Sequence, residues 1–216
     1  MSRRLRGSAG LVKVGSQLFT AEGPRAVQRL AGLGLRVFLD LKFHDIPNTV
    51  AGSVAAAAGL PGVQMMTLHT SGDLAMMRAA REAIAGRKWR PALLGVTILT
   101  SLDSAALRRI GLAGPASSRV VALARLAREA GLDGVVAAAH EAHAIRRACG
   151  PRFLIVVPGI RPAAASANDQ VRVATPAEAI RAGANYLVVG RPITGAVDPR
   201  TAAEAIAAEI AASRRK

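Results

Sequence analysis

Short apolar runs alternate along the chain with longer segments in which apolar residues recur at helical spacing. The apolar runs are apolar on both faces, which is typical of strands in a parallel sheet covered by helices. Glycine, proline and polar residues stand between the segments and indicate turns. The expected strands cover residues 11–15, 37–41, 63–68, 92–99, 134–138, 153–157 and 186–189. The expected helices cover 24–33, 49–59, 73–85, 104–110, 117–130, 141–148, 175–182 and 199–212.

This alternation predicts an α/β fold, and the chain length is near the lower end for a TIM-type (β/α)8 barrel. No linker divides the sequence, so we expect one barrel domain over residues 1–216, with a basic N-terminal segment at 1–10. Seven strands are expected where a barrel has eight, and ten residues are too few for another strand and helix. We therefore expect the first strand to be missing, because the sequence was started too late or because the chain is truly shortened.

The amino-acid composition indicates which kinds of partner the protein could bind. The formal net charge of +15 would by itself favour an anionic partner such as nucleic acid. The arginines are spread along the chain, however, and aromatic residues make up only 3%, so there is no stacking platform for bases. We expect no nucleic-acid partner. No apolar run reaches the length of a membrane span, so we expect no membrane partner either.

Cysteine and histidine usage indicates the compartment and the absence of a metal site. Cys149 is the only cysteine, which rules out an internal disulfide and fits a reducing cytoplasm, where we expect the protein to act. It has no partner motif and is interpreted as inert. No group of cysteine and histidine has metal-ligand spacing, so no metal is expected. His69 follows an expected strand and is interpreted as a structural histidine.

The most unusual stretch covers residues 37–50, where charges interrupt an apolar strand. Residues two apart in a strand share a face, so Asp40 and Lys42 should lie side by side, pointing into whatever the strand encloses. Buried charges are costly unless they are paired, and a structural ion pair remains an open reading of this spacing alone. Only four residues of the chain are lysines, and lysine, unlike arginine, can give up a proton near neutral pH. Asn48 or Thr49 is the expected N-cap of the next helix.

Other polar residues also follow the ends of the expected strands, which is the face that carries the active site in a β/α barrel. Gly190 and Arg191 follow the last strand, where a glycine lets backbone N–H groups approach an anion and an arginine adds a bidentate donor. Arg161 follows the strand before it. These positions predict an enzyme with a phosphate site. The strand-end residues are Lys13, Asp40, Lys42, His69, Thr100, Arg161 and Arg191.

The string Asp-x-Lys-x-x-Asp-Ile-Pro-x-Thr over residues 40–49 resembles the signature of the orotidine 5'-phosphate decarboxylase family. Further similarity lies in residues 13–24, 96–101, 158–170 and 190–194, so the resemblance covers nearly the whole chain from Leu11 onward. It implies decarboxylation of orotidine 5'-phosphate to uridine 5'-phosphate in pyrimidine biosynthesis, without a cofactor or metal. Members of the family also carry a first strand with a ribose-binding aspartate, which this chain lacks.

The resemblance also implies roles for single residues. Lys42 would protonate C6 of the pyrimidine, Asp40 would lie near the departing carboxylate, and Lys13 and Asp45 would complete a row of alternating charge. It implies a homodimer in which Asp45, Ile46 and Thr49 reach into the neighbouring subunit's site. The implied substrate-binding residues are Ile46, Thr49, Thr100, Ser101, Arg161, Gln170, Gly190 and Arg191.

Three alternatives remain open. A sugar-phosphate decarboxylase or isomerase on the same scaffold would share Asp-x-Lys-x-x-Asp, although the Ile-Pro-x-Thr continuation speaks against it. A truncated and inactive barrel would explain the missing strand. A basic nucleic-acid-binding protein with a dead site would explain the net charge.

Overall fold

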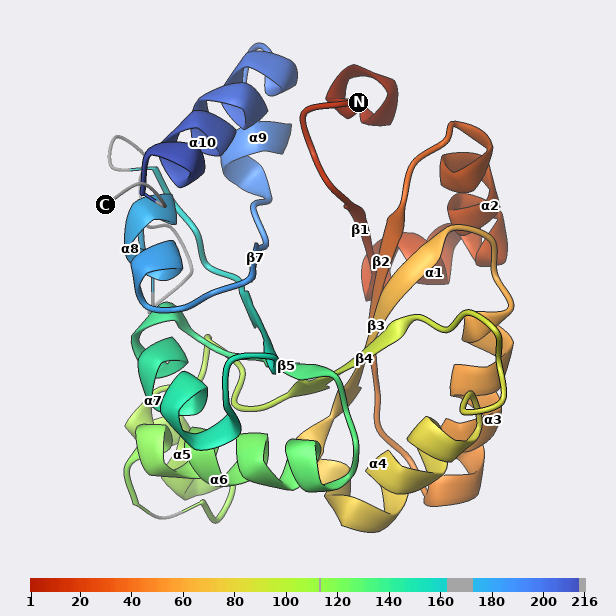
Figure 1. Ribbon diagram of the computed structural model, residues 1–216, viewed down its shortest axis with the longest axis vertical. Coiled ribbons are helices and arrows are strands. Elements are labelled where there is room, and N and C mark those ends of the chain that lie inside the picture. The colour runs from red at the N-terminus through yellow and green to blue at the C-terminus, as the bar shows by residue number, and fades with distance from the viewer. Residues whose placement is uncertain (113, 163–172, 214–216) are drawn as a thin grey trace.

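Seven parallel strands follow one another around a curved sheet in the computed structural model of the chain (Figure 1). The structure describes residues 1–112, 114–162 and 173–213. Each strand pairs with the next one in chain order, and every pairing is parallel. Helices line the outer side of the curve. The TIM-type α/β fold predicted from the alternation of strands and helices is therefore confirmed.

All of the predicted strands and helices are present, with bounds that differ by a few residues. The strands are β1 Val12–Gly15, β2 Val37–Phe43, β3 Val63–His69, β4 Ala92–Val96, β5 Gly134–Val136, β6 Leu154–Val157 and β7 Tyr186–Leu187. The α-helices are α1 Ser16–Glu22, α2 Pro24–Gly32, α3 Pro47–Ala58, α4 Asp73–Glu82, α5 Ser104–Arg109, α6 Ala116–Glu129, α7 Ala139–Cys149, α8 Pro176–Arg181, α9 Arg191–Thr194 and α10 Pro199–Ser213. Two 3-10 helices are η1 Ser2–Leu5 and η2 Thr70–Gly72.

The helices α1 and α9 were not predicted, and both lack the pattern that would reveal them. Within its 7 residues α1 has no fully buried side chain, and Phe19 packs only partly against the core, so the segment is too short to show an apolar stripe. Helix α9 has only 4 residues, too few to show a helical period. The strand predicted to reach residue 99 ends at Val96, although Ile98 is still buried. The apolar run therefore shows which residues are buried, but it does not show where the strand stops pairing.

The start of α3 corrects the predicted cap. Neither Asn48 nor Thr49 is the N-cap; Ile46 is, and Pro47 is the first helical residue. Proline suits this place because the first N–H groups of a helix have no partner within it. The Ile46 N–H instead donates to Oδ1 of Asp45 at 2.6 Å. Asp45 therefore serves as a local hydrogen-bond acceptor where β2 gives way to α3.

Two apolar clusters hold the layers together. The larger lies between the sheet and the helices and includes Leu39 and Met66. The smaller contains Phe38, Met65, Leu94 and Val156, from β2, β3, β4 and β6. Since neighbouring residues of a strand face opposite sides, Phe38 lies on the inner face of the curve and Leu39 on the outer. The smaller cluster forms the apolar floor beneath the charged strand ends.

The strands β1 and β7 are the two edges of the sheet. Within the described residues, β1 pairs only with β2 and β7 only with β6. Residues 2–5 form η1 and no strand precedes β1, so the sheet has the seven strands that the pattern predicts. Figure 1 shows η1 near α10, and the Ser8 hydroxyl donates to Glu204 of that helix at 3.2 Å. No helix in the described part is long and apolar enough to cross a membrane.

Candidate active site

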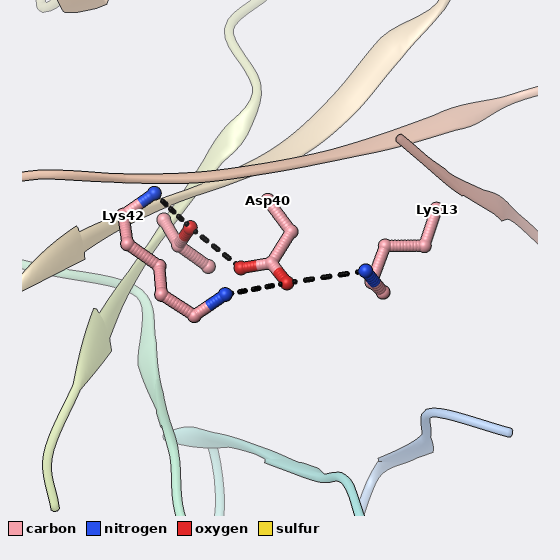
Figure 2. Close-up of polar contacts among 4 residues, drawn as sticks. Lys13, Asp40 and Lys42 are labelled. Carbon is pink, nitrogen blue, oxygen red and sulfur yellow. Dashed lines mark hydrogen bonds and ion pairs between the residues drawn. The ribbon is translucent and has the colours of Figure 1, made fainter. Parts of the chain in front are cut away.

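Three charged side chains meet where β1 and β2 end (Figure 2). Nζ of Lys13 lies 3.3 Å from Oδ2 of Asp40, and Nζ of Lys42 lies 2.9 Å from the same oxygen. Parallel pairing places β1 beside β2, with Gly15 opposite Asp40, so the two lysines approach the carboxylate from different strands. The Asp40 carboxylate is buried, the Lys42 side chain is partly buried, and the Lys13 side chain is exposed. We call these residues the charge triad; it carries one excess positive charge.

The pKa of Asp40 lies below its ordinary value. Burial acts in the opposite direction and would raise the pKa by penalising the charged carboxylate. The hydrogen bond and charge of Lys42, the charge of Lys13 and a hydrogen bond from Thr67 together outweigh it. The carboxylate is therefore ionised at neutral pH although it is buried, and its charge is compensated within the triad.

Two backbone features make room for the triad. A Cβ built on Gly15 would lie 2.9 Å from Nζ of Lys13, so a larger residue there would make the flexible Lys13 side chain shift away from its present place. Lys42 has a φ of 54°, in the left-handed region that residues with a Cβ rarely adopt. Strained backbone of this kind persists only where the surrounding structure holds it, and it is frequent at functional sites.

A cavity of about 1020 Å³ reaches from the carboxyl ends of the strands along β1 to η1 and α2, and it brings the triad together with most of the predicted phosphate residues. Arg161 is buried; its Nη1 donates to the Ile160 carbonyl at 2.8 Å, and its Nε has no partner within the described residues. A buried donor without a protein acceptor is suited to a bound anion. The predicted site residues that line the cavity are Lys13, Asp40, Lys42, Thr100, Arg161, Gly190 and Arg191.

Other predicted site residues lie apart from this cavity. Asp45, Ile46 and Thr49 are exposed at the start of α3 and do not line it. Ser101 is exposed and does not line it either. Gln170 lies outside the described residues. The charge row of one chain therefore contains three of its four predicted members, without Asp45.

His69 and His44 form a ring pair beside the triad, with centroids 5.3 Å apart. Burial lowers the pKa of His69, and the charges of His44 and Lys42 lower it further against the opposing effect of Asp40. His69 is therefore neutral at pH 7. Its place in this pair is compatible with the structural role expected from the sequence.

The described residues contain no group of three or more side chains of the types that commonly bind metals. Cys149 is buried in α7, and burial raises the pKa of its thiol, although three nearby arginines oppose the shift. A protonated, buried thiol is a poor nucleophile.

Two residues of the site escaped the sequence analysis. Thr67 is completely buried in β3 and donates a hydrogen bond to Oδ1 of Asp40 at 2.9 Å. A lone hydroxyl in the run Val63–His69 was the available signal, but threonine is also common in strands for its shape. Gly15 carried no signal, because its role depends on where Lys13 points.

The comparisons with known proteins lead to one family. A family model described as "Orotidine 5'-phosphate decarboxylase / HUMPS family" matches residues 3–206. A protein of Nitrosococcus oceani named orotidine 5'-phosphate decarboxylase is 55% identical over 208 residues, which cover 96% of this chain and 89% of that protein. One of the same name from Moorella thermoacetica is also 55% identical, over 96% of this chain and 84% of that protein. A crystal structure of orotidine 5'-phosphate decarboxylase from Lactobacillus acidophilus is similar with a TM-score of 0.81 and 39% identity, covering 92% of this chain and 86% of that one.

Proposed function

Since the chain belongs to the orotidine 5'-phosphate decarboxylase / HUMPS family, we propose that it converts orotidine 5'-phosphate to uridine 5'-phosphate in pyrimidine biosynthesis. The observation that carries the proposal is the charge triad, which lines the same cavity as Arg161 and Arg191. One part of this cavity offers an ammonium proton beside a fixed carboxylate. Another part offers cations for a phosphate. Orotidine 5'-phosphate requires both.

Lys42 is the general acid in this proposal. The bond between C6 of the pyrimidine and the carboxylate breaks, carbon dioxide leaves, and the electron pair that remains on C6 takes a proton from the ammonium group. Asp40 lies near the departing carboxylate, and Lys13 compensates the charge of Asp40. The contacts of Asp40 with both lysines support these roles, because fixed charges lower a barrier without reorganising during the reaction. The proposed chemistry uses no cofactor and no metal.

The phosphate group is held by Arg161, Gly190, Arg191 and Gln170, and the pyrimidine edge lies near Thr100 and Ser101. The buried Nε of Arg161 supports the phosphate role, because a charged donor in such a place gains from an anionic acceptor. Binding energy from the phosphate is remote from C6 and can be used to orient the reacting part of the substrate.

The active form is a homodimer in this proposal, with Asp45, Ile46 and Thr49 of each chain completing the site of its partner. Two observations support this. Ile46 is a large apolar residue that is 66% exposed, and all three residues lie outside the cavity of their own chain. We also propose that the protein acts in the cytoplasm. Its single cysteine, Cys149, forms no disulfide, which fits a reducing compartment.

Replacing Lys42 tests the reaction. The purified chain should consume orotidine 5'-phosphate, measured by the loss of orotate absorbance and by chromatography of uridine 5'-phosphate. Lys42→Ala should abolish turnover, because it removes the proposed proton donor to C6, while uridine 5'-phosphate still binds in calorimetry. Lys88→Ala, at an exposed lysine, is the matched control and should keep the wild-type rate. Full activity of Lys42→Ala would exclude the assigned role.

The alternative on the same scaffold is tested with the same preparations. A phosphorylated sugar acid replaces the nucleotide, with and without added divalent cation, and release of carbon dioxide is measured. Turnover of the sugar substrate together with inertness toward orotidine 5'-phosphate would refute the proposed function. Inertness toward both would indicate a barrel without this activity.

A further inference from the structure

The strand β2 leaves its regular register where it carries the triad. Leu39 pairs with Met66 and Phe43 pairs with Leu68, with a register shift between them. Residues 40–42 of β2 therefore stand opposite a single residue of β3, Thr67. Such a bulge re-aims side chains and leaves backbone groups without their ladder partners. Here it coincides with the positive φ of Lys42.

The hydroxyl of Thr67 fills the place of the missing ladder partner. Its Oγ1 accepts the backbone N–H of Lys42 at 2.9 Å and donates to Oδ1 of Asp40 at 2.9 Å. A hydroxyl has one donor and two acceptor sites, so it serves both contacts at once. Thr67 is completely buried, which excludes water as a competing partner.

These contacts divide the two oxygens of the Asp40 carboxylate. Oδ1 is held by Thr67, and Oδ2 is held by the ammonium groups of Lys42 and Lys13. Because both oxygens have partners, the orientation of the Asp40 carboxylate is fixed. The same hydroxyl binds the backbone N–H of Lys42. Oγ1 of Thr67 therefore fixes the Lys42 backbone and the Asp40 carboxylate relative to each other.

We propose that Thr67 is a positioning residue, whose hydroxyl holds Lys42 in its left-handed conformation and sets the geometry of Asp40 and Lys42 for proton transfer to the substrate. This rests on the proposed function. Thr67 does not line the cavity and acts only through the two residues that it binds. The bulge is therefore part of the catalytic apparatus and not an irregularity of the sheet.

The test compares Thr67→Val, Thr67→Ser and Thr70→Val. Valine keeps the shape of threonine without the hydroxyl, and serine keeps the hydroxyl. Thr70 is the matched control, because it is also completely buried but its hydroxyl donates to the Val96 carbonyl at 2.9 Å and not to the triad. We expect kcat of Thr67→Val to fall by about 100-fold, the scale of a small misplacement of reacting groups. KM and the affinity for uridine 5'-phosphate should change little.

Thr67→Ser should recover most of the lost kcat, and Thr70→Val should lose thermal stability but keep kcat. A purely structural hydroxyl would behave alike at both positions. Wild-type kcat in Thr67→Val, or serine no better than valine, would overturn the proposal.

Crystal structures of the wild type and of Thr67→Val separate this proposal from the proposed function. In the variant, φ of Lys42 should become negative and the ammonium group should leave Oδ2 of Asp40. An unchanged triad would overturn the positioning role even in an active enzyme. A displaced triad in a protein that never decarboxylates orotidine 5'-phosphate would refute the function and leave the positioning of Lys42 by Thr67 intact.

Discussion

Asp40 keeps its negative charge in a buried place because each of its oxygens has partners of suitable polarity. Oδ1 accepts from a hydroxyl, and Oδ2 lies beside two ammonium groups. The free-energy cost of removing a carboxylate from water is large, and only contacts of this quality offset it. The folded state therefore stabilises the ionised form more than the unfolded chain does.

This difference makes stability depend on pH in a defined direction. The folded pKa of Asp40 is lowered, so its contribution is present above the unfolded pKa of about 3.9 and is lost as the pH falls through the folded value. Asp40→Asn should lower the free energy of unfolding by about 3 kcal/mol at pH 7, because it removes the charged partner of both lysines. The difference from the wild type should narrow below about pH 4.

Urea denaturation of both proteins between pH 3 and pH 7 measures this effect. Glu82→Gln, at an exposed residue of α4, is the control and should follow the wild type at every pH. A difference between Asp40→Asn and the wild type that stays constant down to pH 3 would show that the charge of Asp40 is not what stabilises the fold.

At the scale of secondary-structure elements, one arginine joins the ends of several of them. Arg146 of α7 donates from Nη1 to the carbonyls of Gly150, Pro151 and Phe153 at 2.9, 2.9 and 2.6 Å. Its Nη2 donates to the Gly183 carbonyl at 2.9 Å and to the Asn185 side chain at 2.6 Å, and the same Asn185 oxygen accepts the backbone N–H of Ile155. The guanidinium thus links α7, the start of β6 and the loop before β7.

Replacing this arginine should destabilise the fold without touching the cavity. Arg146→Met keeps much of the side-chain length but removes the donor of four backbone carbonyls and leaves Oδ1 of Asn185 with only the Ile155 N–H, and we expect a loss of about 3 kcal/mol in the free energy of unfolding. Arg147→Met, at the exposed neighbour, should change stability by less than about 0.5 kcal/mol. Chemical denaturation measures both. Equal losses would show that the network around Arg146 contributes little.

The elements with a clear period were predictable, and those that depend on tertiary contacts were not. β2 was recognised from its run of apolar residues, and α7 from apolar residues that recur at helical spacing. Burial of a strand in the sheet, and of one helix face against the sheet, requires these patterns. The bulge that separates Leu39 and Phe43 in register was not predicted, since it depends on Thr67 in the next strand. The sequence analysis correctly predicted that Lys42 lies beside Asp40. It assumed a regular strand, however, and the structure has a bulge there.

The site divides in the same way. Strand-end positions identified Arg161 and Arg191 as cavity residues, because parallel strands deliver their carboxyl ends to one face. The sequence alone could not identify Gly15, whose contribution is the space beside Lys13. Exposed residues such as Asp45 are placed by the resemblance to the family and not by any contact within the chain.

For the whole molecule, the exposed start of α3 leads to a prediction about two chains. If Asp45 completes the partner's site, Lys42→Ala and Asp45→Ala should each be inactive as homodimers. A mixed dimer of the two variants contains one site with both residues intact and one site with neither. After subunit exchange of an equal mixture, roughly a quarter of the wild-type activity should return, because half of the dimers are mixed and each has one working site.

Exchange is verified independently by mass spectrometry of differently labelled subunits. Lys42→Ala mixed with Lys13→Ala is the control, because both residues belong to the same chain's triad and no mixed dimer regains a complete site. Proven exchange without recovered activity would show that Asp45 acts on the site of its own subunit, and an active Asp45→Ala homodimer would show that Asp45 has no catalytic role.

The excess positive charge of the triad has a consequence for the whole catalytic cycle. In the proposed reaction, a substrate carboxylate entering beside Lys13, Asp40 and Lys42 brings the summed charge of these three side chains and the carboxylate to zero. If carbon dioxide departs uncharged and Lys42 gives its proton to C6, as proposed, the summed charge of this group is again zero, now with an amine in place of the ammonium group. The summed charge of this group therefore does not change during decarboxylation, and Lys42 must afterwards take one hydrogen ion from bulk water to regain its ammonium form. Each turnover therefore consumes acid, and an unbuffered solution should drift alkaline at the pace of catalysis once the released gas is swept away.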